Sequence, residues 1–479
     1  MSGTRAAVAE GHRLTKVWDA VDGLTGLVSP LVAYHLALRV FFLHGLRKLQ
    51  EADPAPSWPT WESLVARADD QGARQPLAHL LSEVRLPEEN LQGRSRSTED
   101  IVSLSPSPAA DRQLEALVLA LDPVDESHDL FEDCLERFST RHGVRGEYYT
   151  ARAITELMAS MLAPLATDRI LDPVCGSGGF LVAAAQHVTA GPIAGHQPAL
   201  YGLDVNNEAR HIATMRLVLQ GLDAEIGVGP VDTLHNGLTP SSFDVVLANP
   251  PFNMANWDYN DKLRNHRWAY GPPPKGNANF AWLQRILETL NATGRAGVLL
   301  AAGAATGSRV GERLIRQRLL EDDVVAAIVA LPGKIFRHTK TAACVWLLSK
   351  DKSASPHWGR HPRQEHVLFI DASRTAERVA SRQHVLSRAG ADRIHRTVSA
   401  WRGIGAEAYE DQEGWCRSVT LEEIASRSYD LLPTRYVKTI APQSKPKSKE
   451  IETLTRELYG HFDQATQLER RLRELLEKG

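Results

Sequence analysis

An amide side chain, two prolines and an aromatic ring follow one another in the sequence Asn249-Pro250-Pro251-Phe252. The hydrophobic run 243–248, typical of a buried strand, comes directly before them. Proline fixes the backbone, so the carbonyl of Pro250 and the amide of Asn249 can point together at one exocyclic amine. A strand-terminating turn with a buried phenylalanine is the other interpretation of this motif.

A glycine-rich turn lies upstream, in the order strand, turn and helix start, over residues 169–183. Glycine lets the backbone turn tightly and approach a ligand, and a helix N-terminus offers unpaired N–H groups. A dinucleotide site is the competing interpretation, but Leu181 stands where the third glycine of G-x-G-x-x-G would fall. Asp172, at the start of the turn, suits the ammonium of an amino acid better than a pyrophosphate. The ligand-binding residues predicted in the turn are Gly176, Ser177, Gly178 and Gly179.

Two further carboxylates follow later strand candidates. Asp204 ends the next run, where a carboxylate of a doubly wound sheet reaches ribose hydroxyls, and Asp232 could lie beside an adenine ring. Each acid alone would be read as a helix cap or a solvated residue. Three acids at successive strand ends after a glycine turn favour a nucleoside site instead.

The elements that must position these residues alternate between strand and helix. Short β-rich runs, each followed by a helical pattern, occur at 169–171, 199–203, 243–248, 297–301 and 324–330, with last candidates at 343–349 and 366–370. This alternation predicts an α/β fold with a parallel sheet flanked by helices. We expect a helical N-terminal domain at 1–140, a catalytic domain at 141–352 and its C-terminal extension at 353–440.

A final helix is expected at 449–479, after a linker rich in proline, lysine and serine. Its apolar residues recur at steps of three and four, the pattern of an amphipathic or coiled-coil helix. Packing on its own body and docking of a partner are both compatible with this pattern.

Composition excludes several classes of protein. With 55 Lys+Arg, 58 Asp+Glu and a formal net charge of −3, the chain has no bulk basic signature of a protein that grips DNA alone. Four dispersed cysteines without a C-x-x-C pair disfavour a disulfide framework or a zinc site and suit the cytoplasm. No phosphate-binding G-x-x-x-x-G-K-[ST] loop occurs, and the apolar stretch 24–46 reads as a buried helix, so neither ATP-driven translocation nor a membrane is expected.

Together these motifs resemble the modification subunits of type I restriction-modification systems, which are N6-adenine amino-methyltransferases. Segments 276–282, 330–336 and 431–437 are also similar to that family. The resemblance implies a Rossmann-like methyltransferase fold and S-adenosyl-L-methionine as cofactor. No metal is expected, because the cysteines are dispersed. The segment before the glycine turn resembles the family's stretch around the methionine end of the cofactor, which implies cofactor contacts for Glu147, Tyr148, Tyr149, Thr150, Ala151 and Arg152.

The sequence departs from the family pattern in three places. Ala151 stands where the family usually has proline, and Asp204 stands where it often has glutamate. The stretch 299–303 lacks the proline expected after that strand, so the local loop geometry there is open.

The expected chemistry is transfer of a methyl group to adenine N6 in double-stranded DNA. An adenine flipped from the duplex would stack on Phe252 and donate hydrogen bonds to Asn249 and the Pro250 carbonyl. Because the chain is too short after residue 352 for a target-recognition domain, we expect a separate specificity subunit bound through the C-terminal helix. The resemblance also implies two copies of this chain around the DNA and a restriction/translocase subunit.

Two alternatives remain at this level. N-P-P-[FY] motifs also serve methyltransferases that act on a protein glutamine or on RNA amines. A catalytically inactive methyltransferase fold could instead be a structural subunit of a defence complex, although the intact Asp172, Gly176, Gly178 and Asn249 argue against it.

Overall fold

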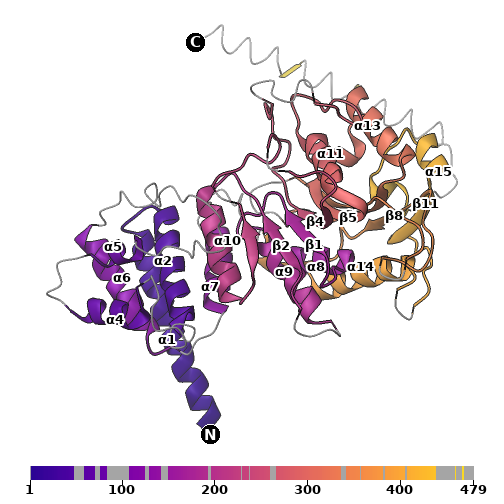
Figure 1. Ribbon diagram of the computed structural model, residues 1–479. Coiled ribbons are helices and arrows are strands. Elements are labelled where there is room, and N and C mark those ends of the chain that lie inside the picture. Colours follow the sequence, from indigo (N-terminus) through magenta and orange to yellow (C-terminus); the bar gives the residue numbers. More distant parts are fainter. Residues whose placement is uncertain are drawn as a thin grey trace. The chain divides into compact units, whose positions relative to one another are not determined.

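The computed structural model forms one compact unit, Met1–Val437, and a second, Lys438–Gly479 (Figure 1). It describes residues 2–47, 59–70, 76–82, 107–124, 129–141, 149–191, 196–227, 229–236, 238–258, 266–335, 341–355, 358–380, 383–404, 407–438, 459 and 467–468. The helix predicted at 449–479 lies almost entirely outside the described residues. The predicted four-part domain division stays a prediction.

A nine-stranded sheet in the order β11-β8-β6-β7-β5-β4-β1-β2-β3 forms the centre of the first unit. Its strands are β1 (Arg169–Asp172), β2 (Ala199–Gly202), β3 (Ala224–Ile226), β4 (Phe243–Ala248), β5 (Leu290–Ala301), β6 (Val325–Ala330), β7 (Ala343–Ser349), β8 (His366–Asp371) and β11 (Cys416–Thr420). Strand β7 runs antiparallel between β5 and β6, and β11 runs antiparallel to β8, whereas the other pairs are parallel. A separate antiparallel pair consists of β9 (Ala376–Ala380) and β10 (Gln383–Leu386).

Helices cover both faces of the sheet, which is why its inner strands are hydrophobic on both sides (Figure 1). Neighbouring strand residues point to opposite faces, as with Ile170 and Leu171 of β1, which belong to different hydrophobic clusters. One cluster contains residues of α8 (Arg152–Leu162), α9 (Gly179–Thr189) and α14 (Arg388–Trp401). The other contains residues of α11 (Asn279–Thr289), α12 (Gly303–Thr306), α13 (Val310–Glu321) and α15 (Leu421–Ser426), and Leu431, Tyr436 and Val437, which flank the short 3-10 helix η3 (Pro433–Arg435). The predicted α/β fold is confirmed.

The N-terminal part is helical, as predicted. Its helices are α1 (Ser2–Thr25), α2 (Pro30–Gly45), α4 (Trp61–Asp69), α5 (Leu77–Ser82), α6 (Pro108–Leu121) and α7 (Asp129–Arg141). Hydroxyl side chains of Ser29, Thr60 and Ser107 cap α2, α4 and α6 by accepting a backbone N–H. These helices share a hydrophobic core with Ile212 and Met215 of α10 (Asn207–Leu219), so α10 belongs to two cores.

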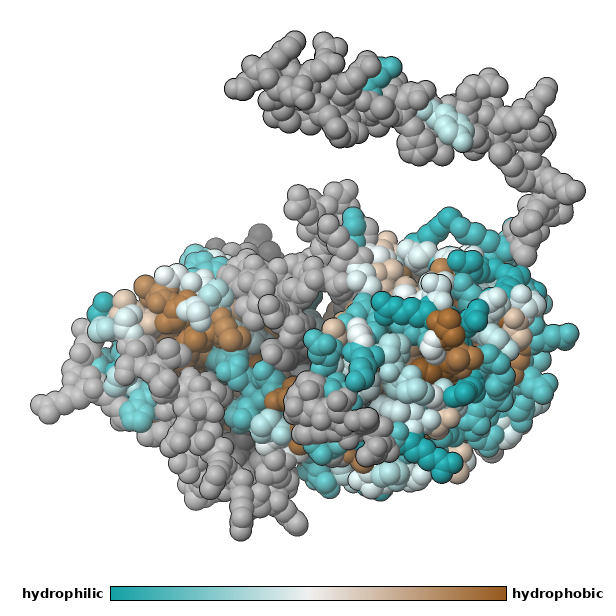
Figure 2. Space-filling view, turned by 90° about the horizontal axis from the view of Figure 1, so that it is seen from above, coloured by the Kyte–Doolittle hydropathy of each residue, from teal (hydrophilic) through white to brown (hydrophobic). Residues whose placement is uncertain are grey.

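The described surface is mostly hydrophilic on the face shown in Figure 2, with compact hydrophobic areas among the polar residues. Among the described residues, no helix combines the length and the hydrophobicity that crossing a membrane requires. Val205, directly after Asp204, is 65% exposed although it is hydrophobic.

Candidate active site

The predicted motifs meet at one edge of the sheet. Strands β4, β1 and β2 are parallel neighbours, with Asp172 of β1 paired to Gly202 of β2. Carboxyl ends of parallel strands lie at the same edge, where open α/β sheets bind their ligands. The structure therefore brings together the glycine turn after β1, Asp204 after β2 and Asn249 after β4.

The glycine turn has a backbone conformation that residues other than glycine rarely adopt. Gly176 and Gly178 have φ angles of +51° and +76°, in the left-handed region that favours glycine. A Cβ atom added to Gly178 would also lie 3.2 Å from the Cβ of Ala213 on α10. The turn is held from β2, because Cys175 N donates to Leu203 O at 2.8 Å. The backbone conformation therefore favours glycine at both positions, and close packing against α10 also favours it at Gly178.

Asp172 is a buried carboxylate, and its two oxygens differ in their hydrogen bonds. Its Oδ1 accepts a hydrogen bond from Val174 N at 3.1 Å, whereas its buried Oδ2 has none among the described residues. Burial raises the pKa of Asp172 well above its usual value, and the nearby charge of Asp204 raises it further. A cationic ligand group at Oδ2 would satisfy this oxygen and compensate the cost of burying its charge.

The other two acids both have protein partners. Asp204 Oδ2 accepts from Gly176 N at 2.9 Å and Oδ1 from Asn206 N at 2.8 Å, so this carboxylate also shapes the glycine turn. Burial raises the pKa of Asp204, while these backbone hydrogen bonds act in the opposite direction. Asp232 lies close by, because Val231 N donates to Asp204 O at 2.9 Å.

Asp232 makes a contact that the sequence did not suggest. Its Oδ2 lies 2.7 Å from Nδ1 of the buried His235, whose Nε2 is 3.5 Å from Oδ1 of Asp258. The side chain of Asp232 remains 36% exposed, which leaves room for a further contact.

Asn249 is tied to the segment that precedes α8. Its Nδ2 donates to Thr150 Oγ1 at 3.0 Å, a bond across 99 positions of sequence. Pro250 is buried, Pro251 is exposed and the half-buried Phe252 packs against the hydrophobic cluster that contains α8 and α9. The amide of Asn249 and the carbonyl of Pro250 thus lie next to the segment for which the family resemblance predicts cofactor contacts.

Three asparagines hold the chain directly after this motif, and the sequence motifs did not single them out. Asn253, with φ of +53°, donates its N–H to Asn279 Oδ1 at 3.0 Å. Its own Oδ1 accepts from Nδ2 of Asn279 and of Asn277, both at 3.0 Å. The signal was the repetition of asparagine inside the segment 276–282, where only a family likeness had been noted.

Not every predicted residue joins the cluster. Glu147 and Tyr148 lie outside the described residues. Arg152, in the first turn of α8, pairs with Glu156 on the same helix at 2.6 Å, and its side chain is 61% exposed. Ala151 is the N-cap residue of α8 and makes no side-chain capping bond.

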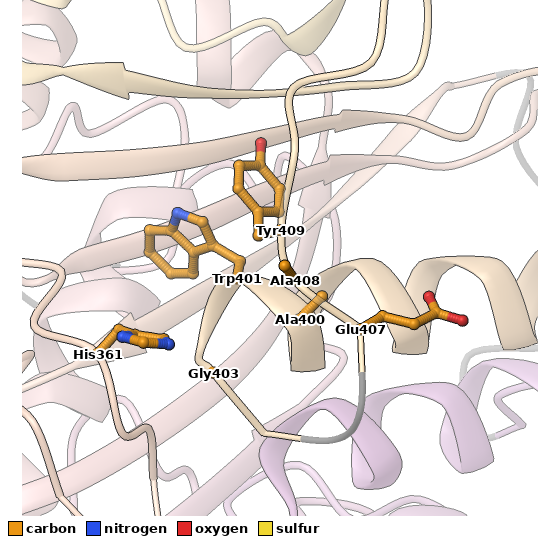
Figure 3. A pocket seen from close by; sticks show the side chains of 7 residues that line it. All are labelled: His361, Ala400, Trp401, Gly403, Glu407, Ala408 and Tyr409. Atoms are coloured by element: carbon orange, nitrogen blue, oxygen red, sulfur yellow. The ribbon is translucent and has the colours of Figure 1, made fainter.

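A cavity of about 480 Å³ lies at the end of α14, away from these motifs. The rings of His361, Trp401 and Tyr409 border it, with Glu407 at its margin (Figure 3). None of its lining residues is among the predicted site residues, and none contacts the turn or Asn249 in the interactions described above. The chemistry suggested by the residues therefore belongs to the sheet edge rather than to this cavity.

Comparison with known proteins identifies the family. Residues 124–445 match the family model described as N-6 DNA Methylase. The HindI methylase subunit of a type I restriction enzyme from Haemophilus influenzae is 35% identical over 355 residues, covering 72% of this chain and 76% of that protein. The MjaIX methylase subunit from Methanocaldococcus jannaschii is 30% identical over 362 residues, covering 73% of this chain and 62% of that protein.

A solved structure supports the fold. The type I restriction-modification methyltransferase subunit from Streptococcus thermophilus matches with a TM-score of 0.70 at 20% identity, covering 90% of this chain and 100% of that one. The predicted methyltransferase fold is therefore confirmed, and the family model together with the HindI relative confirms the predicted class of enzyme. On these grounds, the chain belongs to the N-6 DNA methylase family.

Proposed function

We propose that the chain transfers a methyl group from S-adenosyl-L-methionine to N6 of adenine in DNA, as the modification subunit of a type I restriction-modification complex. The observation that carries this proposal is that an oriented amide, Asn249, lies at the same sheet edge as a buried carboxylate, Asp172, whose Oδ2 has no hydrogen-bond partner among the described residues. Family membership supports the same reaction.

The residues present fit this cofactor. Asp172 Oδ2 would accept from the ammonium of the methionine end, and the helix start at Gly179 offers N–H groups to its carboxylate. Asp204 keeps lone pairs for the ribose hydroxyls, because each oxygen accepts only one backbone bond among those described above. The exposed Val205 would cover apolar surface of the adenine. When bound, the cofactor supplies a sulfonium-activated methyl group.

The target amine would be held by groups fixed in advance. Because Asn249 Nδ2 donates to Thr150, its Oδ1 is left to accept a hydrogen bond from the adenine amine, as is the carbonyl of Pro250. Both acceptors stabilise the positive charge that develops on N6 during in-line transfer. Phe252 would stack on the flipped base.

Replacing Thr150 with valine tests this orientation. The valine keeps the shape but cannot accept from Asn249, so kcat at saturating cofactor should fall about tenfold, the worth of one good hydrogen bond. Thr150→Ser, which keeps the hydroxyl, should stay within about threefold of wild type. If single-turnover assays showed equal losses of the transfer rate in Thr150→Val and Thr150→Ser, the Thr150 hydroxyl would not orient Asn249.

Partner subunits are part of this proposal. The chain's charge of −3 does not favour independent DNA binding, and we propose a separate specificity subunit that contacts the helix predicted at 449–479. Two copies of the chain would enclose the duplex, with a restriction/translocase subunit as a further partner.

The reaction is tested with the full chain and the specificity subunit of the same system. Purified complex, DNA containing the host's recognition sites and cofactor labelled at the methyl group should yield N6-methyladenine, measured by mass spectrometry of DNA nucleosides. Label in a protein glutamine or in RNA, with none in DNA, would favour the alternative substrates. Absence of cofactor binding by calorimetry would favour an inactive structural subunit.

A further inference from the structure

Arg216 of α10 forms hydrogen bonds both to the N-terminal helices and to the glycine turn. Its Nε and Nη2 donate to the two carboxylate oxygens of Glu132 on α7, and the two side chains are 5% and 18% exposed. Its Nη1 donates to the carbonyl oxygen of Ser177 in the turn, at 3.3 Å. One guanidinium therefore binds the helical part on one side and the predicted cofactor turn on the other.

The turn is packed tightly against this guanidinium. A Cβ atom added to Gly179 would lie 3.1 Å from Arg216 Nη1 and 3.3 Å from Thr155 Cγ2. Such distances are tighter than ordinary van der Waals contact, so a side chain at position 179 would require Arg216 or Thr155 to shift by a few tenths of an ångström. Glu132, Arg216 and Gly179 also line a cavity of about 120 Å³ at this place. A shift of Arg216 would therefore move the turn or open this gap.

The N-terminal helices reach the predicted site at a second point. Tyr149, next to Thr150, packs partly buried against the core of the N-terminal helices, and burial raises the pKa of its hydroxyl to about 12. The turn and the segment that holds Asn249 are thus both attached to the helical part.

We propose that Arg216, held by Glu132, is a positioning residue that sets the cofactor-binding conformation of the glycine turn. The N-terminal helices would then contribute to cofactor affinity without touching the cofactor, because supporting hydrogen bonds hold ligand-binding residues in their binding conformation. This inference rests on the proposed function, since it requires that the turn binds S-adenosyl-L-methionine.

Two variants and a matched control test the role in the full-length chain. Glu132→Gln keeps the size of the side chain but removes the charge that fixes Arg216, and Arg216→Lys keeps the charge but loses the forked donors. The control is Glu115→Gln, which breaks a comparable half-buried pair with Arg67 (2.9 Å, 23% and 12% exposed) inside the helical part. Calorimetry gives the cofactor dissociation constant, steady-state assays give KM and kcat, and thermal unfolding monitors the fold.

For Glu132→Gln and Arg216→Lys we expect the dissociation constant and the KM for cofactor to rise about tenfold, with kcat at saturation changed less than about twofold. Glu115→Gln should change unfolding but leave cofactor affinity within about twofold. The proposal is overturned if the Glu132 and Arg216 variants lose only thermal stability, as the control does, or if kcat falls while KM is unchanged. Failure of the proposed function would look different, because the wild-type chain itself would then not bind the cofactor.

Discussion

Asn249→Ala is expected to lower the rate of methyl transfer by at least about 10³-fold, because the transition state loses an oriented acceptor at the nitrogen where charge develops. Cofactor affinity should stay within about twofold, since Asn249 contacts Thr150 through a single hydrogen bond and none of the glycine-turn residues in the bonds described. Single-turnover methylation of DNA and calorimetric titration with S-adenosyl-L-methionine measure the two quantities separately.

A second asparagine provides the control. Asn291 Nδ2 donates to Asp244 Oδ1 at 2.6 Å, near the beginning of β4, whereas Asn249 follows its end. Asn291→Ala should lower the free energy of unfolding by about 1 kcal/mol with little effect on transfer. If Asn249→Ala lost cofactor binding together with activity, its role would be structural and the assignment to the target amine would be wrong.

Asp172→Asn is expected to have effects of opposite sign on folding and on binding. Without cofactor, removing a buried carboxylate whose Oδ2 has no hydrogen-bond partner in the described part of the chain should raise the midpoint of thermal unfolding. With cofactor, the loss of the partner for the ammonium should weaken binding by about 10²-fold or more. Differential scanning fluorimetry and calorimetry, run on the same preparations, test both directions.

The pH dependence of this variant follows from the raised pKa of Asp172. A carboxyl whose folded-state pKa lies above its unfolded value binds its proton more tightly when folded, so the free energy of unfolding falls as pH rises from the unfolded pKa to the folded pKa and stays low above it. The stability gained by Asp172→Asn should therefore be larger at high pH than at low pH. Wild-type affinity for cofactor should fall as pH decreases into the range where Asp172 takes up its proton.

Asp168 is the matched carboxylate for this experiment. It is also buried, but its Oδ2 accepts from Arg295 Nη2 at 2.8 Å. Asp168→Asn should destabilise the fold, by about 3 kcal/mol, because it leaves a guanidinium buried without its counter-charge. If Asp172→Asn and Asp168→Asn shifted the unfolding midpoint in the same direction, the interpretation of Asp172 as a binding site for a ligand cation would be incorrect.

The parallel core of the sheet could be predicted from the sequence, because its strands are short hydrophobic runs with helical patterns between them. Strands β1, β2, β4 and β6 lie where the runs were found. Strand β3, only Ala224–Ile226, is too short to show a periodicity and exists through pairing with β2. Strand β11 pairs with the distant β8, and such long-range pairing leaves no local signal in an edge strand that is only partly buried.

For the candidate site, residue types were predictable and partners were not. The positions of Asp172 and Asn249 after strands placed them at one edge, as the strand order requires. That Asn249 donates to Thr150, or that Arg216 joins Glu132 to the turn, depends on packing between elements far apart in sequence. An arginine inside a helical pattern carries no sign of the carbonyl that it will bind.

Helix α10 places a restriction on how this protein can be recombined with its relatives. Its residues Ile212 and Met215 are buried by the N-terminal helices, while Ala213 and Leu217 face the core beside the sheet. A hybrid protein joined in the connection between α7 and α8 would take its N-terminal helices, which pack on Ile212 and Met215, from one parent. It would take α10 and the core beside the sheet from the other parent. Compatible parents must therefore match along one stripe of a helix that lies more than fifty residues beyond the junction, so modular exchange at the obvious boundary in sequence would produce mismatched chimaeras.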